Sequence, residues 1–317
     1  MNQKVSVFAP ISIGNVSVGF DSLGLAVSPI DGTLVGDIVD IEAGQENQLI
    51  LAGTHIDRLP SEPQDNIVWS CLSLFNEQLQ KRGINVQPVH MTLRKNIPVS
   101  SGLGSSACSV VAALYALNEF YQQPFNETEL LNLMAEQEGK ISGSIHYDNI
   151  APCYLGGLQL MTSDATQPCL TVPSFDDCYW VMAYPDIEVS TKMAREILPN
   201  QYDKSTCIEY GQNLAGFVAA SFQNNKSLAF SLLKDVMAEP YRQSLLPNFS
   251  AVKEALIEQG CLAVGISGSG PTVFAVTDSL YKAKQTQKFL DNNYIINQQG
   301  FTHICQVDQQ GARHLSN

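Results

Sequence analysis

The stretch PVSSGLGSSA, residues 98–107, follows a predicted strand over 89–96 and opens a strongly apolar predicted helix over 108–121. Gly102 and Gly104 let the backbone come close to a bound group. The free N–H groups at the start of the helix favour an anion there, because they carry the positive end of the helix dipole. The stretch therefore predicts a phosphate-binding loop, which needs no excess of basic side chains.

Other interpretations of this loop have to be weighed. Gly102-x-Gly104-x-x-Ala107 matches a dinucleotide-binding fingerprint, but a second helix follows where that fold requires a strand with an acidic end. A Walker A loop has Lys after its last glycine, and Ser105 stands there instead. A turn that only caps a helix explains the glycines but not the four serines around them.

The overall charge limits the possible partners. The chain has 317 residues with 31 acidic and 18 basic side chains, a formal net charge of −13, and no basic block. This argues against nucleic acid as a partner. The eight cysteines are scattered without a C-x-x-C pair, which indicates reduced, structural residues. No apolar run approaches the ~20 residues of a membrane span, and residues 1–10 do not resemble a signal peptide, so we expect a cytoplasmic protein without a membrane partner.

Strands and helices are intermixed along the whole chain without a regular βαβ repeat, which predicts the α+β class. Asn126, followed by Glu129, gives the helix over 126–140 a capping-box start. A Pro- and Asp-rich stretch, 163–178, predicts a boundary between two domains, 1–163 and 164–317. The other predicted strands are 4–9, 34–42, 179–185 and 301–308, and the other predicted helices are 65–83, 190–198, 208–223, 226–237, 248–259 and 279–292.

A second glycine-rich loop, GISGSGPT (265–272), lies between two apolar segments. A tight hairpin is its simplest explanation. Its three glycines and two serines are more than a hairpin needs, so a second role in the site is also open.

Three segments together resemble the GHMP kinases: APISIGNVSVGFDSLGLAV (9–27), PVSSGLGSSA (98–107) and GISGSGPTVFAV (265–276). Within that family the chain is most similar to the homoserine kinases, on GFDSLG (19–24), EGKISGSIHYDNIAP (138–152), VSTKMAREILP (189–199) and AEPYRQSLLPNF (238–249). The resemblance covers essentially the whole chain. It implies a GHMP kinase-like fold, with a ribosomal protein S5 domain 2-like, nucleotide-binding N-terminal domain and a ferredoxin-like C-terminal domain.

The activity that the resemblance implies is the phosphorylation of L-homoserine by ATP to O-phospho-L-homoserine, in threonine biosynthesis. Asn15 and Asp21 would hold the amino acid, with Asp21 facing its ammonium group. Arg195 and Arg242 would bind its carboxylate, a use that suits the planar guanidinium group. From the sequence alone, Asp21 can also be a helix cap, and each arginine can be part of a surface ion pair.

For catalysis, the resemblance places Thr191 and Arg195 near the reacting end of the substrate. Asn149 stands where some relatives carry an aspartate base, and His146 lies near it in the sequence, as a catalytic or a structural histidine. No Asp, Glu or Lys stands out as a base. We therefore expect transfer through a loose transition state, with the hydroxyl proton passing late to the phosphate.

For the nucleotide, the resemblance implies that Ser106 and Glu138 hold Mg²⁺, although Glu138 can also be a solvated surface acid. The residues expected to bind ATP are Asn66, beside the adenine, and Pro98, Val99, Ser100, Ser101, Gly102, Leu103, Gly104, Ser105, Ser106, Ala107 and Cys108. The chain departs from the family at Ser100 and Ser17, where many relatives have glycine. Neither change removes a backbone N–H, so we expect the function to be kept.

Two other functions stay open at this point. One is another GHMP kinase activity, on a sugar or an isoprenoid acid. The other is a catalytically inactive member of the family that binds a ligand. We also expect L-threonine to compete with homoserine in the same site, and the family resemblance implies a homodimer.

Overall fold

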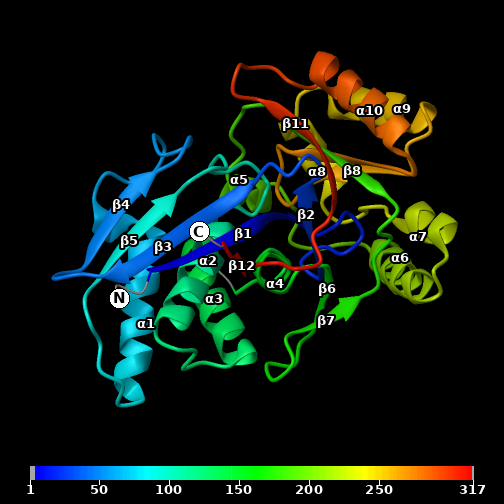
Figure 1. The fold of residues 1–317 in the computed structure, drawn as a ribbon. Helices are drawn as coiled ribbons and strands as arrows, with labels where there is room; N and C mark the ends of the chain where they lie inside the picture. Colours follow the sequence, from blue (N-terminus) through cyan, green and yellow to red (C-terminus); the bar gives the residue numbers. More distant parts are fainter. Residues whose placement is uncertain (1–3, 144, 316–317) are drawn as a thin grey trace.

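The computed structural model describes residues 4–143 and 145–315, without the side chains of Ile141 and Ser142 (Figure 1). Residue 144, in the segment 138–152 that carries part of the family resemblance, lies outside the described residues. The strands are β1 (Lys4–Gly14), β2 (Leu23–Pro29), β3 (Gly36–Ala43), β4 (Gln48–Ala52), β5 (Val89–Arg94), β6 (Leu158–Met161), β7 (Cys169–Val172), β8 (Tyr179–Tyr184), β9 (Ala263–Ile266), β10 (Val273–Thr277), β11 (Phe301–Val307) and β12 (Arg313–His314). The helices are α1 (Ile67–Lys81), α2 (Ser105–Phe120), α3 (Glu127–Ser142), α4 (Ile150–Leu155), α5 (Thr191–Glu196), α6 (Lys204–Phe222), α7 (Lys226–Leu232), α8 (Glu239–Arg242), α9 (Phe249–Glu258) and α10 (Leu280–Asn293).

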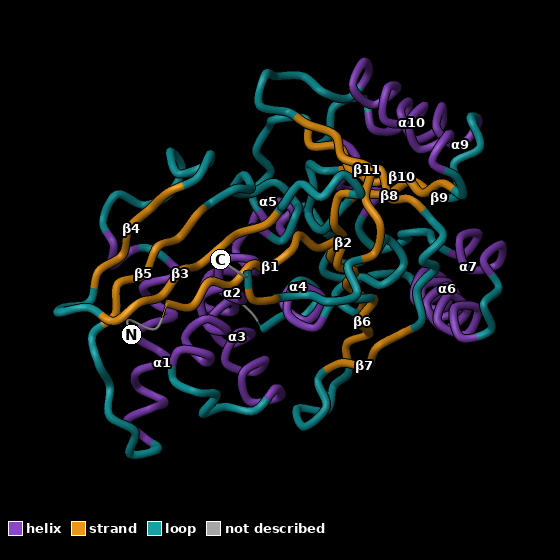
Figure 2. The backbone as a smooth tube through the Cα atoms, in the orientation of Figure 1, coloured by secondary structure: helices purple, strands orange, loops and turns teal. Residues whose placement is uncertain are grey.

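The strands form one continuous sheet in the order β4-β5-β3-β1-β2-β11-β8-β10-β9 (Figure 2). Among these neighbours only β4 and β5 are parallel, and α1 lies between them in the sequence. The sheet passes from the N-terminal to the C-terminal half of the chain where β2 pairs with β11, with Val27 opposite Val307. This mixture of antiparallel strands and helices confirms the α+β class.

Helix α2 lies at the centre of the N-terminal half. It packs against β1 and β3 on one side and against α1 and α3 on the other (Figure 1). Its apolar residues are buried all round, as the continuous apolar sequence requires. A second, smaller core joins α9 and α10 to β8, β9, β10 and β11 and includes Phe249, Leu256, Val264 and Leu290. The start of α2, which carries the glycine loop, is therefore held by the larger core.

The structure corrects several predicted helix boundaries; the helix predicted over 208–223, for example, begins at Lys204. Helix α2 begins at Ser105 rather than at 108, because Gly104 adopts φ 69° as its N-cap and the two following serines are already helical. Helix α7 ends at Leu232 rather than at 237. The Asp235 carboxylate accepts hydrogen bonds from the backbone N–H groups of residues 237–239. This local bonding competes with a continued helix.

Other local predictions have mixed outcomes. The capping box of α3 is confirmed, since Asn126 and Glu129 bond to each other's backbone N–H groups at 3.0 Å. The sequence patterns did not predict the elements β2, β4, β6, β7, β12, α4 and α8. Strand β7 lies inside the Pro- and Asp-rich stretch 163–178 and pairs with β6, so the chain is ordered there. The domain boundary at 163 and 164 stays a prediction.

Candidate active site

Three segments far apart in the sequence meet at the start of α2. The backbone N–H of Ser12, on β1, donates to the carbonyl of Leu103 in the 98–107 loop at 3.2 Å. Gly268, in the 265–272 loop between β9 and β10, donates to the carbonyl of Gly14 at 3.1 Å. The 265–272 loop also bonds directly to the 98–107 loop, through Ser267 Oγ and Thr272 Oγ1. The second glycine loop is therefore both a hairpin connection and part of the site.

The 98–107 loop needs glycine at two positions. Gly102 and Gly104 have φ values of 78° and 69°. A Cβ atom would lie 2.7 Å from the carbonyl oxygen of Gly270 at the first position and 2.3 Å from Ser12 Oγ at the second. Ser100 has φ 55°, a left-handed conformation that is strained for serine. Ser17 has φ 54° and is strained in the same way.

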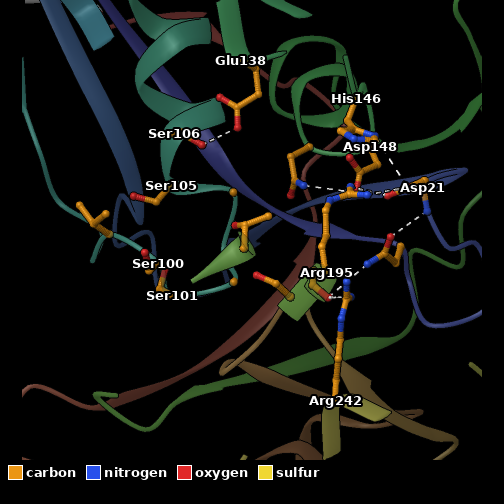
Figure 3. Close-up of a pocket in the computed structure, with 18 residues that line it drawn as sticks. Asp21, Ser100, Ser101, Ser105, Ser106, Glu138, His146, Asp148, Arg195 and Arg242 are labelled. Atoms are coloured by element: carbon orange, nitrogen blue, oxygen red, sulfur yellow. Dashed lines mark hydrogen bonds and ion pairs between the residues drawn. The ribbon is translucent and has the colours of Figure 1, made fainter. Parts of the chain in front are cut away.

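The loop forms one wall of a cavity of about 200 Å³ (Figure 3). The cavity gathers most of the predicted site residues: Asn15, Asp21, Val99, Ser100, Ser101, Gly102, Gly104, Ser105, Ser106, Glu138, His146, Asn149, Thr191, Arg195 and Arg242. It adds Asp148, Gly268 and Ser269. Figure 3 shows the serines of the loop on one side of the cavity and the arginines and aspartates on the other.

Some residues predicted to bind the nucleotide lie elsewhere. Leu103, Ala107 and Cys108 are buried in the core and do not line the cavity. Pro98 is buried and does not line the cavity either. Asn66 is the N-cap of α1, where its side chain accepts the N–H of Val68 at 2.9 Å, and it does not line the cavity.

The start of α2 provides polar groups that face the cavity. The hydroxyl groups of Ser101 and Ser105 are buried and have no hydrogen-bond partner among the described residues. Because the first N–H groups of a helix also lack partners within it, this wall presents a set of donors to an anion.

The Ser106 hydroxyl donates to Glu138 Oε1 at 2.6 Å, which joins the first turn of α2 to α3. Burial raises the pKa of Glu138 above its usual value, although the Ser106 hydrogen bond and Lys95 lower it in part. A nearby cation favours the ionised carboxylate. A carboxylate and a hydroxyl oxygen beside an anion-binding loop fit Mg²⁺, which takes one or two protein oxygens together with phosphate and water.

The opposite wall is built from charged side chains. Arg195, on α5, forms two hydrogen bonds to the Asp21 carboxylate, at 3.0 and 3.2 Å. Asp21 adopts φ 52°, and Asn15 Oδ1 accepts its N–H at 2.9 Å. Arg242 is buried and donates to the carbonyls of Ala194 and Gly268, each at 3.0 Å. Asp21 and Arg195, which were predicted to bind the ammonium and the carboxylate of the substrate, thus pair with each other.

His146 lies beside this pair, with Nδ1 3.8 Å from Asp21 Oδ2. Burial lowers the pKa of His146, Asp21 opposes that effect, and Arg195 adds to it. The lowered pKa of His146 favours its neutral imidazole.

Asp148 is a site residue that sequence reasoning missed. It is buried and lines the cavity. Burial, and then the nearby charge of Asp21, raise the pKa of Asp148 to about 7, while Arg195 lowers it. Its neighbour Asn149 was predicted, so adjacency was the only available signal. The burial that changes its chemistry comes from packing against β1 and β2, which no local pattern shows.

Asn149 has its side chain directed at the loop. Its Oδ1 accepts a hydrogen bond from the Ser12 hydroxyl at 2.9 Å, and its Nδ2 lies 3.3 Å from Asp148 Oδ2. Although Asn149 is the N-cap residue of α4, its side chain makes no capping bond. It therefore links Ser12, on β1, to Asp148.

The chain belongs to the GHMP kinase family. The model for the GHMP kinases N terminal domain matches residues 66–157, and the model for the GHMP kinases C terminal matches residues 215–296. The protein is thus a kinase by class, and the members of this family use ATP as co-substrate.

Among solved structures, the chain is similar to a homoserine kinase from Cytophaga hutchinsonii, with 34% identity and a TM-score of 0.89 over 99% of this chain and 98% of that one. It has the fold of the phosphomevalonate kinase of Streptococcus pneumoniae, with 14% identity and a TM-score of 0.73 over 99% of this chain and 100% of that one. It also has the fold of an L. major mevalonate kinase, with 16% identity and a TM-score of 0.67 over 97% of each chain. These matches confirm the two-domain GHMP kinase fold. Within residues 4–143 and 145–315, no helix combines the length and apolarity needed to cross a membrane.

Proposed function

We propose that this protein transfers the γ-phosphoryl group of ATP to L-homoserine. The observation that carries the proposal is the cavity itself, which places an anion-binding loop opposite paired acidic and basic groups. That second wall suits a small zwitterion, since it offers partners for both an ammonium and a carboxylate group. The 34% identity with a homoserine kinase over nearly the whole chain supports the same substrate.

On the loop wall, the N–H groups at the start of α2 and the hydroxyls of Ser101 and Ser105 bind the phosphates. Ser106 and Glu138 would hold Mg²⁺, which would supply charge neutralisation for the phosphoryl oxygens. Since Glu138 is buried, its carboxylate is ionised most readily when a cation is present. The predicted contact of Asn66 with adenine belongs to this proposal as well, although it lies outside the cavity.

On the charged wall, the bound substrate separates the ion pair between Asp21 and Arg195, and each of the two side chains then pairs with a charged group of the substrate. Its ammonium group takes the place of the Arg195 guanidinium beside Asp21, and Asp148 ionises next to it. Its carboxylate binds Arg195, whose Nε has no hydrogen-bond partner among the described residues, and Arg242. Each charge of the protein keeps a partner through the exchange, so the site avoids leaving a charge desolvated and unpaired.

The substrate hydroxyl then lies between the two walls, where Asn149 and Thr191 orient it towards the phosphate. Phosphoryl transfer through a loose transition state relies on positioning and charge stabilisation rather than on a strong base. His146 lies beside Asp21 and its pKa is lowered, so we assign it a role in orienting Asp21 rather than in taking the proton. The proton passes late, to the transferred phosphoryl group.

The test is ADP release by the purified protein with ATP, MgCl₂ and a panel of acceptors, namely L-homoserine, mevalonate and galactose. We expect turnover of homoserine, with O-phosphohomoserine identified by ³¹P NMR, and little turnover of the other two. Turnover of mevalonate without homoserine would assign a different GHMP activity. Calorimetric binding of ADP without turnover of any acceptor would indicate an inactive, ligand-binding member of the family.

Three parts of the proposal concern the setting of the enzyme. L-Threonine shares the ammonium and carboxylate of homoserine, so we propose that it competes in the same cavity. A homodimer and a cytoplasmic location are the expected assembly and place for such an enzyme. Each is open to direct measurement, by inhibition kinetics, light scattering and cell fractionation.

A further inference from the structure

A buried ion pair lies directly beneath the 98–107 loop, outside the cavity. Lys95 follows the end of β5, and Asp37 lies on β3. The Lys95 Nζ atom is 2.5 Å from Asp37 Oδ2. The two residues are only 1% and 0% exposed, so neither charge is solvated. Such a pair needs a reason, because burying two charges costs about as much free energy as their attraction returns.

The pair is also bonded to the first turns of α2. Lys95 Nζ donates to the Ser105 carbonyl at 2.9 Å and to Ser109 Oγ at 3.1 Å. Ser109 Oγ donates in turn to Asp37 Oδ2 at 2.6 Å. The backbone N–H of Asn96 donates to Asp37 Oδ1 at 3.1 Å. Two strands of the sheet are thus joined to the start of the helix by one network.

The bond to the Ser105 carbonyl has a direct geometric consequence. The carbonyl of Ser105 and the N–H of Ser106 belong to the same planar peptide group. A fixed carbonyl oxygen therefore fixes the direction of the Ser106 N–H, one of the donors without an intrahelical partner. The same peptide group also fixes the position of the Ser106 Cα atom, and so the direction of the side chain that bonds to Glu138.

We propose that Lys95 and Asp37 are positioning residues that hold the first peptide groups of α2 in the direction needed to bind phosphate. The inference rests on the proposed nucleotide role of the loop, and it is independent of the acceptor that is phosphorylated.

The contacts distinguish this role from a direct one. A lysine ammonium has three donor hydrogens, and the three acceptors Asp37, Ser105 and Ser109 match that number. Lys95 does not line the cavity. The network therefore acts on a bound phosphate through the helix backbone, and not by placing the ammonium group against it.

The test compares Lys95→Met with the double variant Lys95→Met/Asp37→Asn, which removes both charges and keeps an acceptor for Asn96. The dissociation constant of ADP is measured by calorimetry without an acceptor, and the melting temperature on the same sample. The single variant leaves a buried carboxylate unpaired, so its melting temperature should fall by roughly 10 °C. The double variant should recover most of that loss. ADP binding should weaken about tenfold to a hundredfold in both variants, because neither one keeps the ammonium group that donates to the Ser105 carbonyl.

Arg94→Met is the matched control. Arg94 precedes Lys95 and forms an ion pair with Asp40 between the same two strands, at 2.6 Å, but its side chain is partly exposed. Its removal should leave ADP binding unchanged.

Three outcomes overturn the inference, and they are distinguishable. Recovery of both stability and ADP affinity in the double variant would make the pair a purely structural feature. Wild-type ADP affinity in Lys95→Met would show that the ammonium group does not position the start of α2. Wild-type protein that binds no ADP would overturn the nucleotide role of the loop together with this inference, whereas failure to phosphorylate homoserine would leave the inference standing.

Discussion

The two walls of the cavity recognise their ligands by different physical means. The loop wall is built from backbone N–H groups and small hydroxyl side chains, and two of its glycines leave no room for a Cβ atom. The charged wall is built from side chains that neutralise one another, above all Asp21 and Arg195. In a chain with a net charge of −13, backbone donors bind a polyanion without the cost of gathering basic residues. Paired charges suit a small zwitterion, because its ammonium and carboxylate groups replace the partners that Asp21 and Arg195 lose when they separate.

This difference predicts opposite sensitivities. The loop wall should be sensitive to added atoms and tolerant of a change at Ser100, whose hydroxyl has no assigned role, provided that the backbone keeps its conformation. The charged wall should be sensitive to removed charges, and its effects should be confined to the amino acid. The following predictions test that division, from the largest expected effect to the smallest.

Glu138→Gln should lower kcat about 10²- to 10³-fold, because the amide cannot replace the carboxylate that holds the cation beside the phosphates. The fold should be kept, since burial already favours the neutral form of Glu138 and glutamine has nearly the same shape. Activity and thermal unfolding can be measured on one sample. An activity loss that only follows a loss of stability would show that Glu138 has a structural role.

Arg195→Met should weaken the binding of homoserine and of threonine by a similar factor of about 30. Removing one partner of a desolvated charge pair costs about 2–5 kcal/mol, and the lower end applies because about a third of the Arg195 side chain is exposed (32%). ATP affinity should hardly change. The measurement is calorimetric binding of threonine beside the KM for homoserine. Normal threonine binding in a variant that has lost homoserine would place threonine in a separate site.

Asp148→Asn should change the pH dependence of stability. The pKa of Asp148 is raised from 3.8 to about 7 in the folded protein. Between these values the folded state binds the proton more tightly than the unfolded state, so the wild type loses stability as pH rises through this range, by about 1.4 kcal/mol for each unit of difference in pKa. Asparagine is neutral throughout. The variant should therefore gain melting temperature relative to the wild type between pH 5 and pH 8.

The charged groups around Asp148 suggest a control for this experiment, which is to repeat it with the substrate bound. Arg195 and Asp21 act on Asp148 in opposite directions, and Glu138 adds a smaller repulsion. A substrate ammonium group should reverse the effect by favouring the ionised form. A difference in melting temperature that does not change with pH would show that Asp148 keeps an ordinary pKa.

Much of the fold and of the site was predictable because it is encoded locally. The glycine spacing at Gly102 and Gly104, followed by an apolar helix, indicated the anion loop without any knowledge of the other strands. The pairing of Asp21 with Arg195 and the burial of Asp148 depend on segments separated by more than 100 residues, so no local pattern could show them. Strand β4 was missed because it lies at the edge of the sheet, where only one neighbour supports it. Local chemistry predicted the glycine loop, the family resemblance implied most of the other residues that line the cavity, and packing decided how they pair.

Ser100→Gly should have the smallest effect, and Gly102→Ala is its matched opposite. Ser100 has φ 55°, a left-handed conformation that costs an ordinary residue roughly 1–2 kcal/mol, and glycine relieves this strain. Glycine also makes the unfolded chain more flexible, which offsets about 0.5–1 kcal/mol of the gain. The melting temperature should therefore rise by only a few degrees. ADP affinity should stay within about twofold of the wild type, since hydrogen bonding by the backbone N–H groups does not depend on this side chain.

At Gly102, in contrast, a Cβ atom would lie 2.6 Å from the carbonyl oxygen of Ser267, so alanine should displace the loop and weaken ADP binding about tenfold or more. Equal losses in the two variants would mean that the Ser100 hydroxyl binds phosphate, and the loop wall would then depend on its side chains as the charged wall does.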